Sequence, residues 1–376
     1  MPNRRLQRVV EQSLNSAWGG NVALEPGDQN GLSGRDYVHR FRVGVAPAGS
    51  PSSIIVKRPR KADEELTRFF NEWACLELLT ECCPEPPAPR VYAGDADHRF
   101  LAMEDLGASE RLDHAFLGGD PTRATEMLVG LMQALGQMHA ATFGQRARFD
   151  AIFSEHARRP PPPRIDRSEQ RQKAIEDALK HLAVPAGPRF LDEMADLGRR
   201  VESADTEALI HGDPCPDNCQ YVAGRVRLLD FEHGRFGNVF SDGSYPRIVF
   251  PTCWCLGRLP NDVADRALDA YRRVLALRMP HAAAEPRFTE GMTDASIVWA
   301  WQMFAGWHMP DVLSKDHEWG LATVRQRILF RFALVLSMLE RDGRYPAIAE
   351  TTRRTREALA ARWKDLGEIL LYPAFR

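Results

Sequence analysis

Three side chains with oxygen atoms suited to phosphate chemistry stand close together in the stretch 208–232. Asp213 comes first, Asn218 follows five residues later, and Asp230 ends an apolar strand after a hairpin turn. Transfer of a phosphoryl group from ATP needs a carboxylate that orients the attacking hydroxyl and accepts its proton, and it needs oxygen ligands for Mg²⁺. The spacing of these three residues supplies both kinds of group.

The order of these residues resembles the catalytic and metal loops of a known superfamily. The chain reads H-G-D-x-x-x-x-N from His211 to Asn218, followed by a hairpin and an Asp-Phe pair at Asp230. This pattern resembles the aminoglycoside phosphotransferases and choline kinases, which have the kinase-like fold. The resemblance implies that Asp213 is the catalytic base and that His211 supports the loop structurally. It also implies that Asn218 and Asp230 bind Mg²⁺. The plain alternative, a turn followed by a solvated strand end, does not account for the ordered set.

Upstream residues extend the resemblance to a phosphate-binding lysine. Residues 54–57 read as a short strand ending in Lys57, and Glu72 lies in the helix predicted over 62–81. In kinases of this fold such a lysine contacts the α- and β-phosphates and pairs with a helical glutamate. Other glutamates of the helix compete for this pairing. We prefer Glu72 because it borders the apolar stripe of the helix and can point inward.

Two further segments are predicted to contact the nucleotide. Glu104 to Leu106 resembles the family's hinge, where backbone groups meet the adenine edge, although a plain strand-to-helix connector also fits. The segment 31–34 can form a flexible turn whose backbone N–H groups at Gly34 and hydroxyl at Ser33 approach phosphate oxygens. The chain lacks G-x-G-x-x-G and G-x-x-x-x-G-K-[ST], which removes the dinucleotide-fold and P-loop interpretations.

Two departures favour a small-molecule acceptor over a protein substrate. Protein kinases read H-R-D and D-F-G and close their activation loop with A-P-E. This chain has His211-Gly-Asp213 and Asp230-Phe-Glu232, with no later A-P-E. Asp242 resembles a family aspartate that braces the catalytic loop from below, and a turn-capping role fits the sequence about as well.

The sequence is only suggestive about the acceptor. Five tryptophans lie in the second half of the chain: Trp254, Trp299, Trp301, Trp307 and Trp319. Their aromatic faces, with carboxylates near the active loop, could hold a cationic amine. Trp299 and Trp301 cannot share one helix face, so some of these rings pack in the core. The resemblance leaves an aminoglycoside-like antibiotic, an amino alcohol and a sugar-like metabolite open as acceptors, and with them antibiotic resistance or a metabolic role.

The pattern of apolar residues predicts a small sheet with one helix, followed by a mostly helical part. The resemblance implies that these are the two lobes of an α+β, bilobal protein-kinase-like fold. Residues 1–107 form the nucleotide-binding lobe, a small antiparallel sheet with one helix, ending at the hinge. Its predicted strands are 35–45, 53–57, 90–93 and 100–103. Residues 108–376 form a mostly helical lobe that carries the catalytic and metal loops and the acceptor site. It includes a long helix over about 123–142 and one strand-like patch, the hairpin over 220–231.

Composition and charge exclude several classes of function. A net charge of -2 and a pI near 6.6 give no global attraction to nucleic acid or anionic membranes. The most apolar late segment, 328–339, is interrupted by Arg331 and is too short to cross a bilayer, so it is predicted to be a buried helix. No signal-peptide pattern occurs at the start, so we expect a cytoplasmic protein. The oligomeric state cannot be predicted.

The seven cysteines are an odd number without regular spacing, which favours reduced thiols. Cys215, Cys219, Cys253 and Cys255 could suggest a zinc site, but no C-x-x-C pair exists.

We therefore predict an ATP- and Mg²⁺-dependent kinase that phosphorylates a hydroxyl of a small molecule. A non-catalytic nucleotide-binding module is the main alternative, and a protein kinase is the other. ATP and GTP cannot be distinguished from the sequence.

Overall fold

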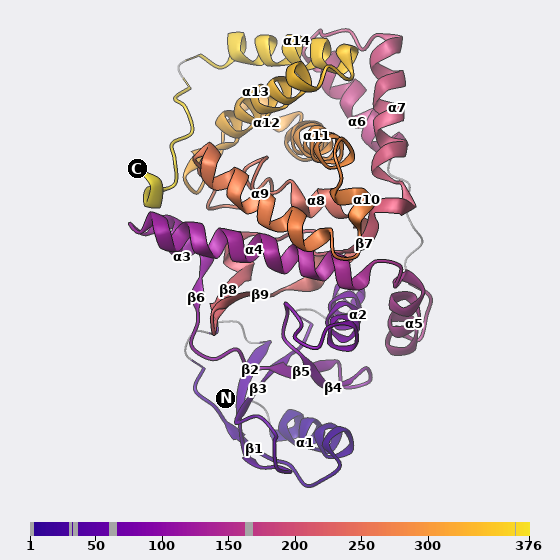
Figure 1. Cartoon of the computed structure of the whole chain (residues 1–376), viewed down its shortest axis with the longest axis vertical. Helices are drawn as coiled ribbons and strands as arrows, with labels where there is room; N and C mark the ends of the chain where they lie inside the picture. The colour runs from indigo at the N-terminus through magenta and orange to yellow at the C-terminus, as the bar shows by residue number, and fades with distance from the viewer. Residues whose placement is uncertain (1–3, 30–31, 33–36, 60–65, 162–167, 365) are drawn as a thin grey trace.

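The computed structural model describes residues 4–29, 32, 37–59, 66–161, 168–364 and 366–376. A small sheet with its helices lies at one end of the molecule, and a larger, mostly helical part lies at the other (Figure 1). This arrangement confirms the predicted α+β, protein-kinase-like fold.

The N-terminal sheet has five strands in the order β1-β2-β3-β5-β4, and each neighbouring pair is antiparallel. Its strands are β1 (Ala23–Pro26), β2 (Val38–Val45), β3 (Ser53–Lys57), β4 (Val91–Asp95) and β5 (Phe100–Glu104). In β3 the side chains of Ile54 and Val56 are fully buried on one face of the strand. Because successive side chains of a strand point to opposite faces, Lys57 lies on the other face. The position of Lys57 along β3 therefore sets the face of the sheet from which its side chain projects.

Two helices accompany this sheet, where the sequence predicted one. Helix α2 (Leu66–Cys82) corresponds to the predicted helix and contributes most of its residues to the main core. Helix α1 (Arg4–Trp18) was not predicted, and it covers the sheet with Leu6, Val10 and Leu14. These residues recur every four positions and make one apolar stripe.

The helical part is built around α4 (Pro121–Thr142), which packs along α9 (Asn261–Leu275) on one side and against the hairpin over residues 219–228 on the other (Figure 1). Asp120 caps α4 by accepting hydrogen bonds from the backbone N–H groups of Thr122 and Arg123, and Pro121 occupies the first helical position. The remaining α-helices are α3 (Leu112–Leu117), α5 (Arg146–Ala157), α6 (Ser168–His181), α7 (Pro188–Val201), α8 (Val239–Gly243), α10 (Pro280–Ala283), α11 (Arg287–Trp301), α12 (Asp311–Ser314), α13 (Val324–Asp342) and α14 (Pro346–Arg362).

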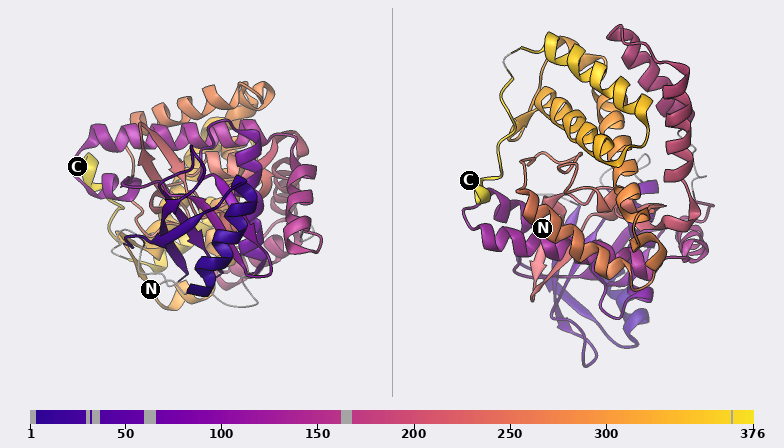
Figure 2. Two further views of the ribbon diagram at one scale, coloured as in Figure 1. Left: turned by 90° about the horizontal axis from the view of Figure 1, so that it is seen from below. Right: turned by 45° about the horizontal axis from the view of Figure 1, so that its top comes forward.

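Short elements connect these helices. The 3-10 turns are η1 (Ala204–Thr206), η2 (Pro216–Asn218), η3 (Phe231–His233) and η5 (Pro373–Phe375), and a π-helical segment η4 (Gln302–His308) continues α11. The last turn of the chain, η5, returns to α3 (Figure 2). There the rings of Tyr372 and Phe116 lie 4.4 Å apart.

The predicted hairpin is present, and additional strands lie beside it. Strands β8 (Cys219–Val222) and β9 (Arg225–Leu228) are joined by Ala223 and Gly224, whose φ angles of 48° and 85° suit a tight hairpin turn. The prediction that this hairpin is the only strand-like patch of the second half was wrong. The helical part also contains β6 (Glu110–Arg111), β7 (Glu207–Ile210), β10 (Arg235–Asn238), β11 (Glu318–Trp319) and β12 (Ala322–Thr323). Strands of two to four residues are too short to give a periodic signal.

None of the helices in the described ranges is long and apolar enough to span a lipid bilayer.

Candidate active site

The predicted lysine, its helical partner and one predicted metal ligand meet in the structure. Lys57 Nζ lies 2.7 Å from the Glu72 carboxylate and 2.7 Å from Asp230 Oδ1. Burial lowers the pKa of Lys57, but the charges of Glu72 and Asp230 outweigh this effect and raise the pKa above its usual value. The lysine is therefore held as a cation between β3, α2 and the end of β9.

Asp213 and Asn218 lie together in the loop that follows β7. The Asn218 side-chain N–H donates to the Asp213 carbonyl at 3.0 Å, and the Leu229 N–H donates to the Asn218 carbonyl at 2.8 Å. Leu229 directly precedes Asp230, which adopts left-handed φ and ψ angles of 65° and 60°. These bonds join the catalytic loop to the segment that carries Asp230.

Asp242 holds the catalytic loop from its buried side. Its carboxylate accepts hydrogen bonds from the backbone N–H groups of His211, at 2.6 Å, and Gly212, at 3.1 Å. It also lies 3.3 Å from His139 Nε2. Burial raises the pKa of Asp242, yet the hydrogen bond and charge of His139 outweigh it, so the pKa is lowered. The loop-bracing geometry that the resemblance implied is therefore present, with a histidine beneath it.

His211 is a structural connector. Its ring is fully buried, and burial lowers its pKa, so the ring is neutral. Nε2 then donates to the Leu229 carbonyl at 2.8 Å, and Nδ1 accepts from the Asp213 N–H at 3.3 Å. One neutral imidazole thus spans the catalytic loop and the strand end that leads to Asp230.

The environment of Asp213 suits a base that works near neutral pH. Burial is the main effect that raises the pKa of Asp213 to about 6, while the Thr252 hydrogen bond opposes the rise. Thr252 Oγ1 donates to Asp213 Oδ1. In the described part of the chain no side chain hydrogen-bonds to Oδ2, so that oxygen can receive a substrate proton.

The oxygen atoms near this loop fit a magnesium ion. Because the Asn218 amide nitrogen is used by the Asp213 carbonyl, its amide oxygen is the atom left to face a ligand. Asp230 adds a carboxylate from the other side of the hairpin. Carboxylate and amide oxygens are the donors that Mg²⁺ prefers. The donor set therefore matches the predicted metal.

The predicted adenine hinge lies where β5 leaves the sheet. The Glu104 N–H donates to the Arg90 carbonyl at 2.9 Å, and the Glu104 carboxylate lies 2.6 Å from Arg227 of β9. Glu104 thus ties β5 to the hairpin, and its N–H is not available to a ligand. Leu106, half-buried in the connection, remains a predicted adenine contact. The predicted phosphate loop at Ser33 and Gly34 lies outside the described residues.

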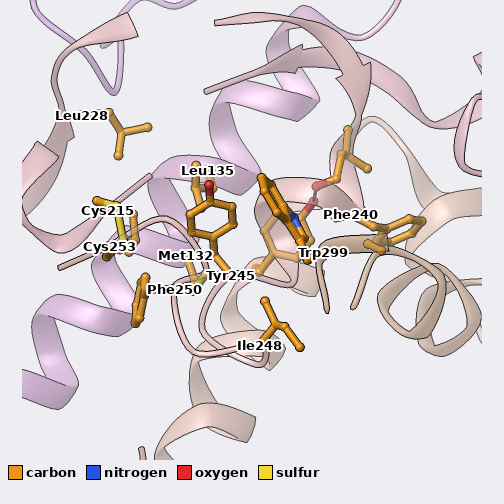
Figure 3. Packing of buried hydrophobic residues seen from close by; sticks show 14 of the residues in the cluster. Met132, Leu135, Cys215, Leu228, Phe240, Tyr245, Ile248, Phe250, Cys253 and Trp299 are labelled. Atoms are coloured by element: carbon orange, nitrogen blue, oxygen red, sulfur yellow. Dashed lines mark hydrogen bonds between the residues drawn. A yellow bond between two sulfur atoms is a disulfide. The ribbon is translucent and has the colours of Figure 1, made fainter. Parts of the chain in front are cut away.

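A disulfide beside the catalytic loop contradicts the expectation of reduced thiols. Cys215 and Cys253, both buried, are bonded with a sulfur–sulfur distance of 2.04 Å (Figure 3). Cys215 Sγ lies 3.1 Å from Asp213 Oδ1, which is a contact and not a hydrogen bond because a disulfide sulfur has no proton. Bonded sulfurs are not thiolates, so the disfavoured zinc site has lost two of its four ligands. No local pattern in the sequence indicates that these two loops meet.

The tryptophans divide as expected between core and surface. Trp299 and Trp301 are buried, and the Trp299 indole donates to the Ser241 carbonyl at 2.9 Å. Trp254 and Trp307 are exposed. Trp254 adjoins the disulfide, and its indole N–H donates to Asp217 of the catalytic loop at 3.2 Å. One exposed aromatic ring therefore contacts the loop that carries the candidate base.

The small antiparallel sheet, the larger helical part and the ion pairs of Lys57 are together those of a kinase-like phosphotransferase fold. A family model described as "Phosphotransferase enzyme family" (APH) matches residues 34–287, which is more than half of the chain. The protein belongs to this family. A search of curated protein sequences finds no match.

Solved structures that resemble the chain include three kinases. One is a putative aminoglycoside phosphotransferase from Ralstonia eutropha JMP134, with 16% identity, 97% of this chain and 99% of that chain covered, and a TM-score of 0.44. The ternary complex of APH(2")-IIa with streptomycin and ATP has 15% identity, coverages of 81% and 94%, and a TM-score of 0.41. The choline kinase LicA from Streptococcus pneumoniae has 14% identity, coverages of 95% and 99%, and a TM-score of 0.41. At these identities and TM-scores the likenesses carry no argument about substrate.

Proposed function

We propose that the protein transfers the γ-phosphoryl group of ATP to a hydroxyl group of a small molecule, with Mg²⁺ as cofactor. The observation that carries this proposal is the ion pair of Lys57 with Glu72 and Asp230, close to a loop that presents Asp213 and Asn218. A buried cation with two carboxylates is expensive to assemble unless it has a use, because each charge must be desolvated. Binding and orienting phosphates is such a use.

In the proposed reaction each residue has one task. Lys57, fixed by Glu72, contacts the α- and β-phosphates, while Asn218 and Asp230 would hold Mg²⁺. The metal, when bound, offsets negative charge on the phosphoryl group. Asp213 Oδ2 orients the acceptor hydroxyl and receives its proton as the new oxygen–phosphorus bond forms. The bond from the γ-phosphorus to the bridging oxygen breaks, and ADP leaves with that oxygen.

We infer that the acceptor binds on the Trp254 side of the catalytic loop. The exposed Trp254 ring and the Asp217 carboxylate beside it could contact a cationic or sugar-like acceptor. An aminoglycoside-like antibiotic, an amino alcohol and a sugar-like metabolite all fit this chemistry, and either antibiotic resistance or metabolism could use it.

We place the boundary between the nucleotide-binding lobe (residues 1–107) and the acceptor-binding lobe (residues 108–376) at Gly107. The φ angle of Gly107 is 66°, a conformation that glycine adopts without steric cost. Adenine would contact the backbone up to Leu106, and phosphates would lie under Ser33 and Gly34. A cytoplasmic location also stays a proposal. The Cys215–Cys253 disulfide argues against it, because cytosolic proteins rarely keep disulfides.

The test is ATP consumption by the purified protein with a panel of aminoglycosides, amino alcohols and sugars. We expect at least one acceptor to stimulate ADP release and to yield a phosphorylated product by mass spectrometry. Asp213→Asn should lower turnover by about 10²–10⁴-fold while nucleotide binding persists. Asp265→Asn is the matched control, because Asp265 is exposed on α9 and forms a surface ion pair with Arg247. Tight ATP binding without transfer to any acceptor would instead support the non-catalytic module.

A further inference from the structure

A mostly buried segment after α8 faces the candidate base. We call residues 248–254 the brace segment. Within it Thr252 Oγ1 donates to Asp213 Oδ1, and it also lies 3.2 Å from Tyr245 Oη and 3.3 Å from Cys215 Sγ. Figure 3 shows Tyr245 and the disulfide on this side of the core. The threonine is therefore enclosed by three groups of the catalytic region.

The destination of the single Thr252 proton follows from these contacts. The Cys215 sulfur is in a disulfide and can only accept. Tyr245 Oη donates its own proton to the Gly212 carbonyl at 3.0 Å. Among the acceptors that remain, a carboxylate is the strongest, because hydrogen bonds to charged groups are shorter and stronger than neutral ones. The Thr252 hydroxyl is therefore committed to Asp213 Oδ1.

The brace segment is held from behind by two buried arginines of α13. Arg327 donates to the carbonyls of Cys253, at 2.6 Å, and Trp254, at 2.9 Å. Arg331 donates to the carbonyls of Ile248, at 3.3 Å, and Pro251, at 3.1 Å. Both arginine side chains are almost fully buried, and in the described part of the chain neither pairs with a carboxylate. Arg327 also donates to the carbonyls of Ala322 and Trp319, and Arg331 Nη1 has no hydrogen-bond partner among the described residues. Four backbone carbonyls of the brace segment thus accept hydrogen bonds from the two arginines.

The backbone of the segment shows the same constraint. Val249 and Phe250 have φ angles of 52° and 45°, in the left-handed region that branched and bulky residues avoid. Such conformations persist when the surrounding structure over-determines them. The disulfide at Cys253 adds a covalent link from the same segment to the catalytic loop. Thr252 is thus fixed relative to Asp213 from several directions.

We propose that Thr252 is a positioning residue for the phosphoryl transfer, holding Oδ1 of Asp213 so that Oδ2 is presented to the acceptor hydroxyl. This inference rests on the proposed function of Asp213. The terminal side-chain torsion of an aspartate has a broad distribution of angles, so a carboxylate without a fixed partner rotates about it. With one oxygen fixed, the other keeps a single direction toward the acceptor.

The kinetic test compares three variants of the full chain. Thr252→Val keeps the shape and removes the hydroxyl, and it should lower kcat by about 10–100-fold, the usual effect of losing an orienting partner. The KM for ATP should not change, because the Lys57 ion pairs are untouched. Thr252→Ser keeps the hydroxyl and should restore most of the turnover. Thr352→Val is the matched control: Thr352 is fully buried in α14, and its hydroxyl has no hydrogen-bond partner among the described residues.

A crystal structure of the Thr252→Val variant gives a readout that does not need turnover. We expect the Asp213 carboxylate to rotate away from its wild-type orientation, and Thr252→Ser to keep it. An unmoved carboxylate, or a Thr252→Val kcat equal to that of Thr352→Val, would overturn the positioning role. If the wild type phosphorylates nothing, the proposed function fails, and the orientation of Asp213 in the two variants still decides whether Thr252 sets it.

Discussion

The two carboxylates of the site have contrasting partners. Asp230 lies 2.7 Å from Lys57 Nζ, whereas Asp213 has no lysine or arginine partner in the described ranges of the chain. Asp213 is also buried enough that its pKa rises to about 6. Active sites often separate acid–base roles by giving two titratable groups different surroundings. The ion pair keeps Asp230 ionised, which suits a metal ligand. The raised pKa of Asp213 suits a group that accepts a proton.

The raised pKa of Asp213 predicts the acid limb of the pH profile. Asp213 can accept a proton only in its ionised form. Activity is therefore lost as the pH falls through about 6, where Asp213 takes up a proton. We expect kcat/KM to be nearly constant above about pH 7 and to fall about tenfold per pH unit well below the pKa. The measurement is kcat/KM between about pH 5 and about pH 9 with an acceptor that has no group titrating in that range.

Asp265→Asn serves as a control for this profile, since it should leave the limb unchanged. Asp213→Asn should abolish the limb along with most of the activity. A wild-type kcat/KM that stays level down to about pH 5 would contradict the assignment of Asp213 as the base.

Among the elements, those that carry Lys57, Glu72 and the hairpin were predictable from the sequence. Alternation in β3, the apolar stripe of α2 and the turn residues Ala223 and Gly224 are local signals. The predicted buried helix with Arg331 in it is also confirmed as part of α13. Local periodicity identifies such elements because each one buries one face.

The brace segment and its disulfide were not predictable in this way. Thr252 and Asp213 are 39 residues apart, and the arginines that hold the segment lie a further 70 or more residues along the chain. No periodic pattern encodes contacts over such separations. An arginine at a core position was the one available signal, since a buried guanidinium must find acceptors. Strands β7 and β10 also have only four residues each, and unlike β8 and β9 they are not joined by a short turn, so they were missed.

The disulfide predicts a measurable stabilisation of the helical part. It closes a loop with a sequence separation of 38, for which chain-entropy reasoning gives about 3–4 kcal/mol. The double variant Cys215→Ser/Cys253→Ser should therefore unfold at a lower temperature or urea concentration than the wild type. Wild-type protein treated with a dithiol reductant should unfold like the double variant.

Cys82→Ser is the control for the disulfide, because Cys82 is a half-buried free thiol on α2. Alkylation of the unfolded, unreduced protein should label five thiols, and after reduction it should label seven. Seven labels before reduction would show that Cys215 and Cys253 are not bonded.

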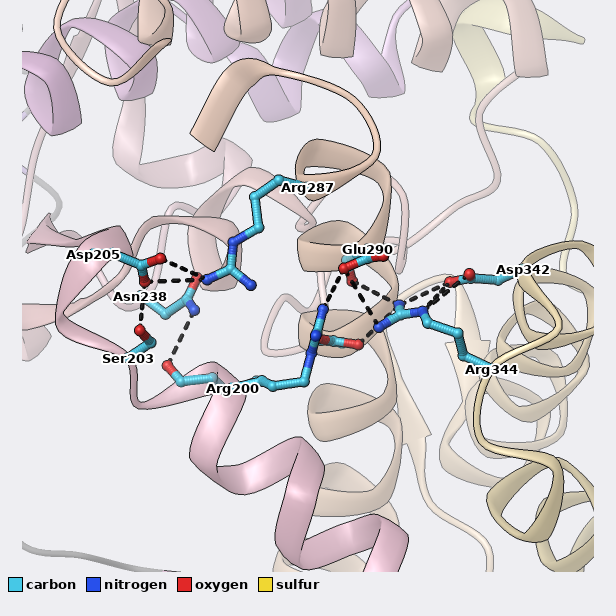
Figure 4. A network of polar contacts seen from close by, with 10 residues as sticks. Arg200, Ser203, Asp205, Asn238, Arg287, Glu290, Asp342 and Arg344 are labelled. Carbon is cyan, nitrogen blue, oxygen red and sulfur yellow. Dashed lines mark hydrogen bonds and ion pairs between the residues drawn. The ribbon is translucent and has the colours of Figure 1, made fainter. Parts of the chain in front are cut away.

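Over the whole molecule, a charged network joins elements of the helical part. Arg200 of α7 lies 2.9 Å from Asp294 of α11 and also pairs with Glu290 (Figure 4). Arg344, at the turn between α13 and α14, lies 3.0 Å from Asp294 and 2.7 Å from Asp342. Asp294 is only 2% exposed, so one arginine from α7 and one from the α13–α14 turn converge on one buried carboxylate. The network orients α7, α11 and the α13–α14 turn as one unit.

Removing the central carboxylate should loosen that unit without touching the nucleotide site. Asp294→Ala leaves Arg200 and Arg344 without their shared buried partner, and we expect a loss of about 2 kcal/mol in the free energy of unfolding. This value lies below that for a fully buried pair because both arginines are partly exposed to water. ATP affinity should be unchanged, since Lys57 and Asp230 lie outside the network.

Urea unfolding and ATP titration of Asp294→Ala, with Asp265→Ala as control, test this separation. The control removes an exposed pair and should cost less than about 1 kcal/mol. If Asp294→Ala weakened ATP binding as strongly as it weakened folding, the two ends of the molecule would be coupled, and the network would belong to the nucleotide site. If it changed neither, the buried carboxylate would contribute no net stability, as happens when desolvation of an ion pair cancels its attraction. Only loss of stability with intact ATP affinity agrees with a scaffold that shapes the acceptor side alone.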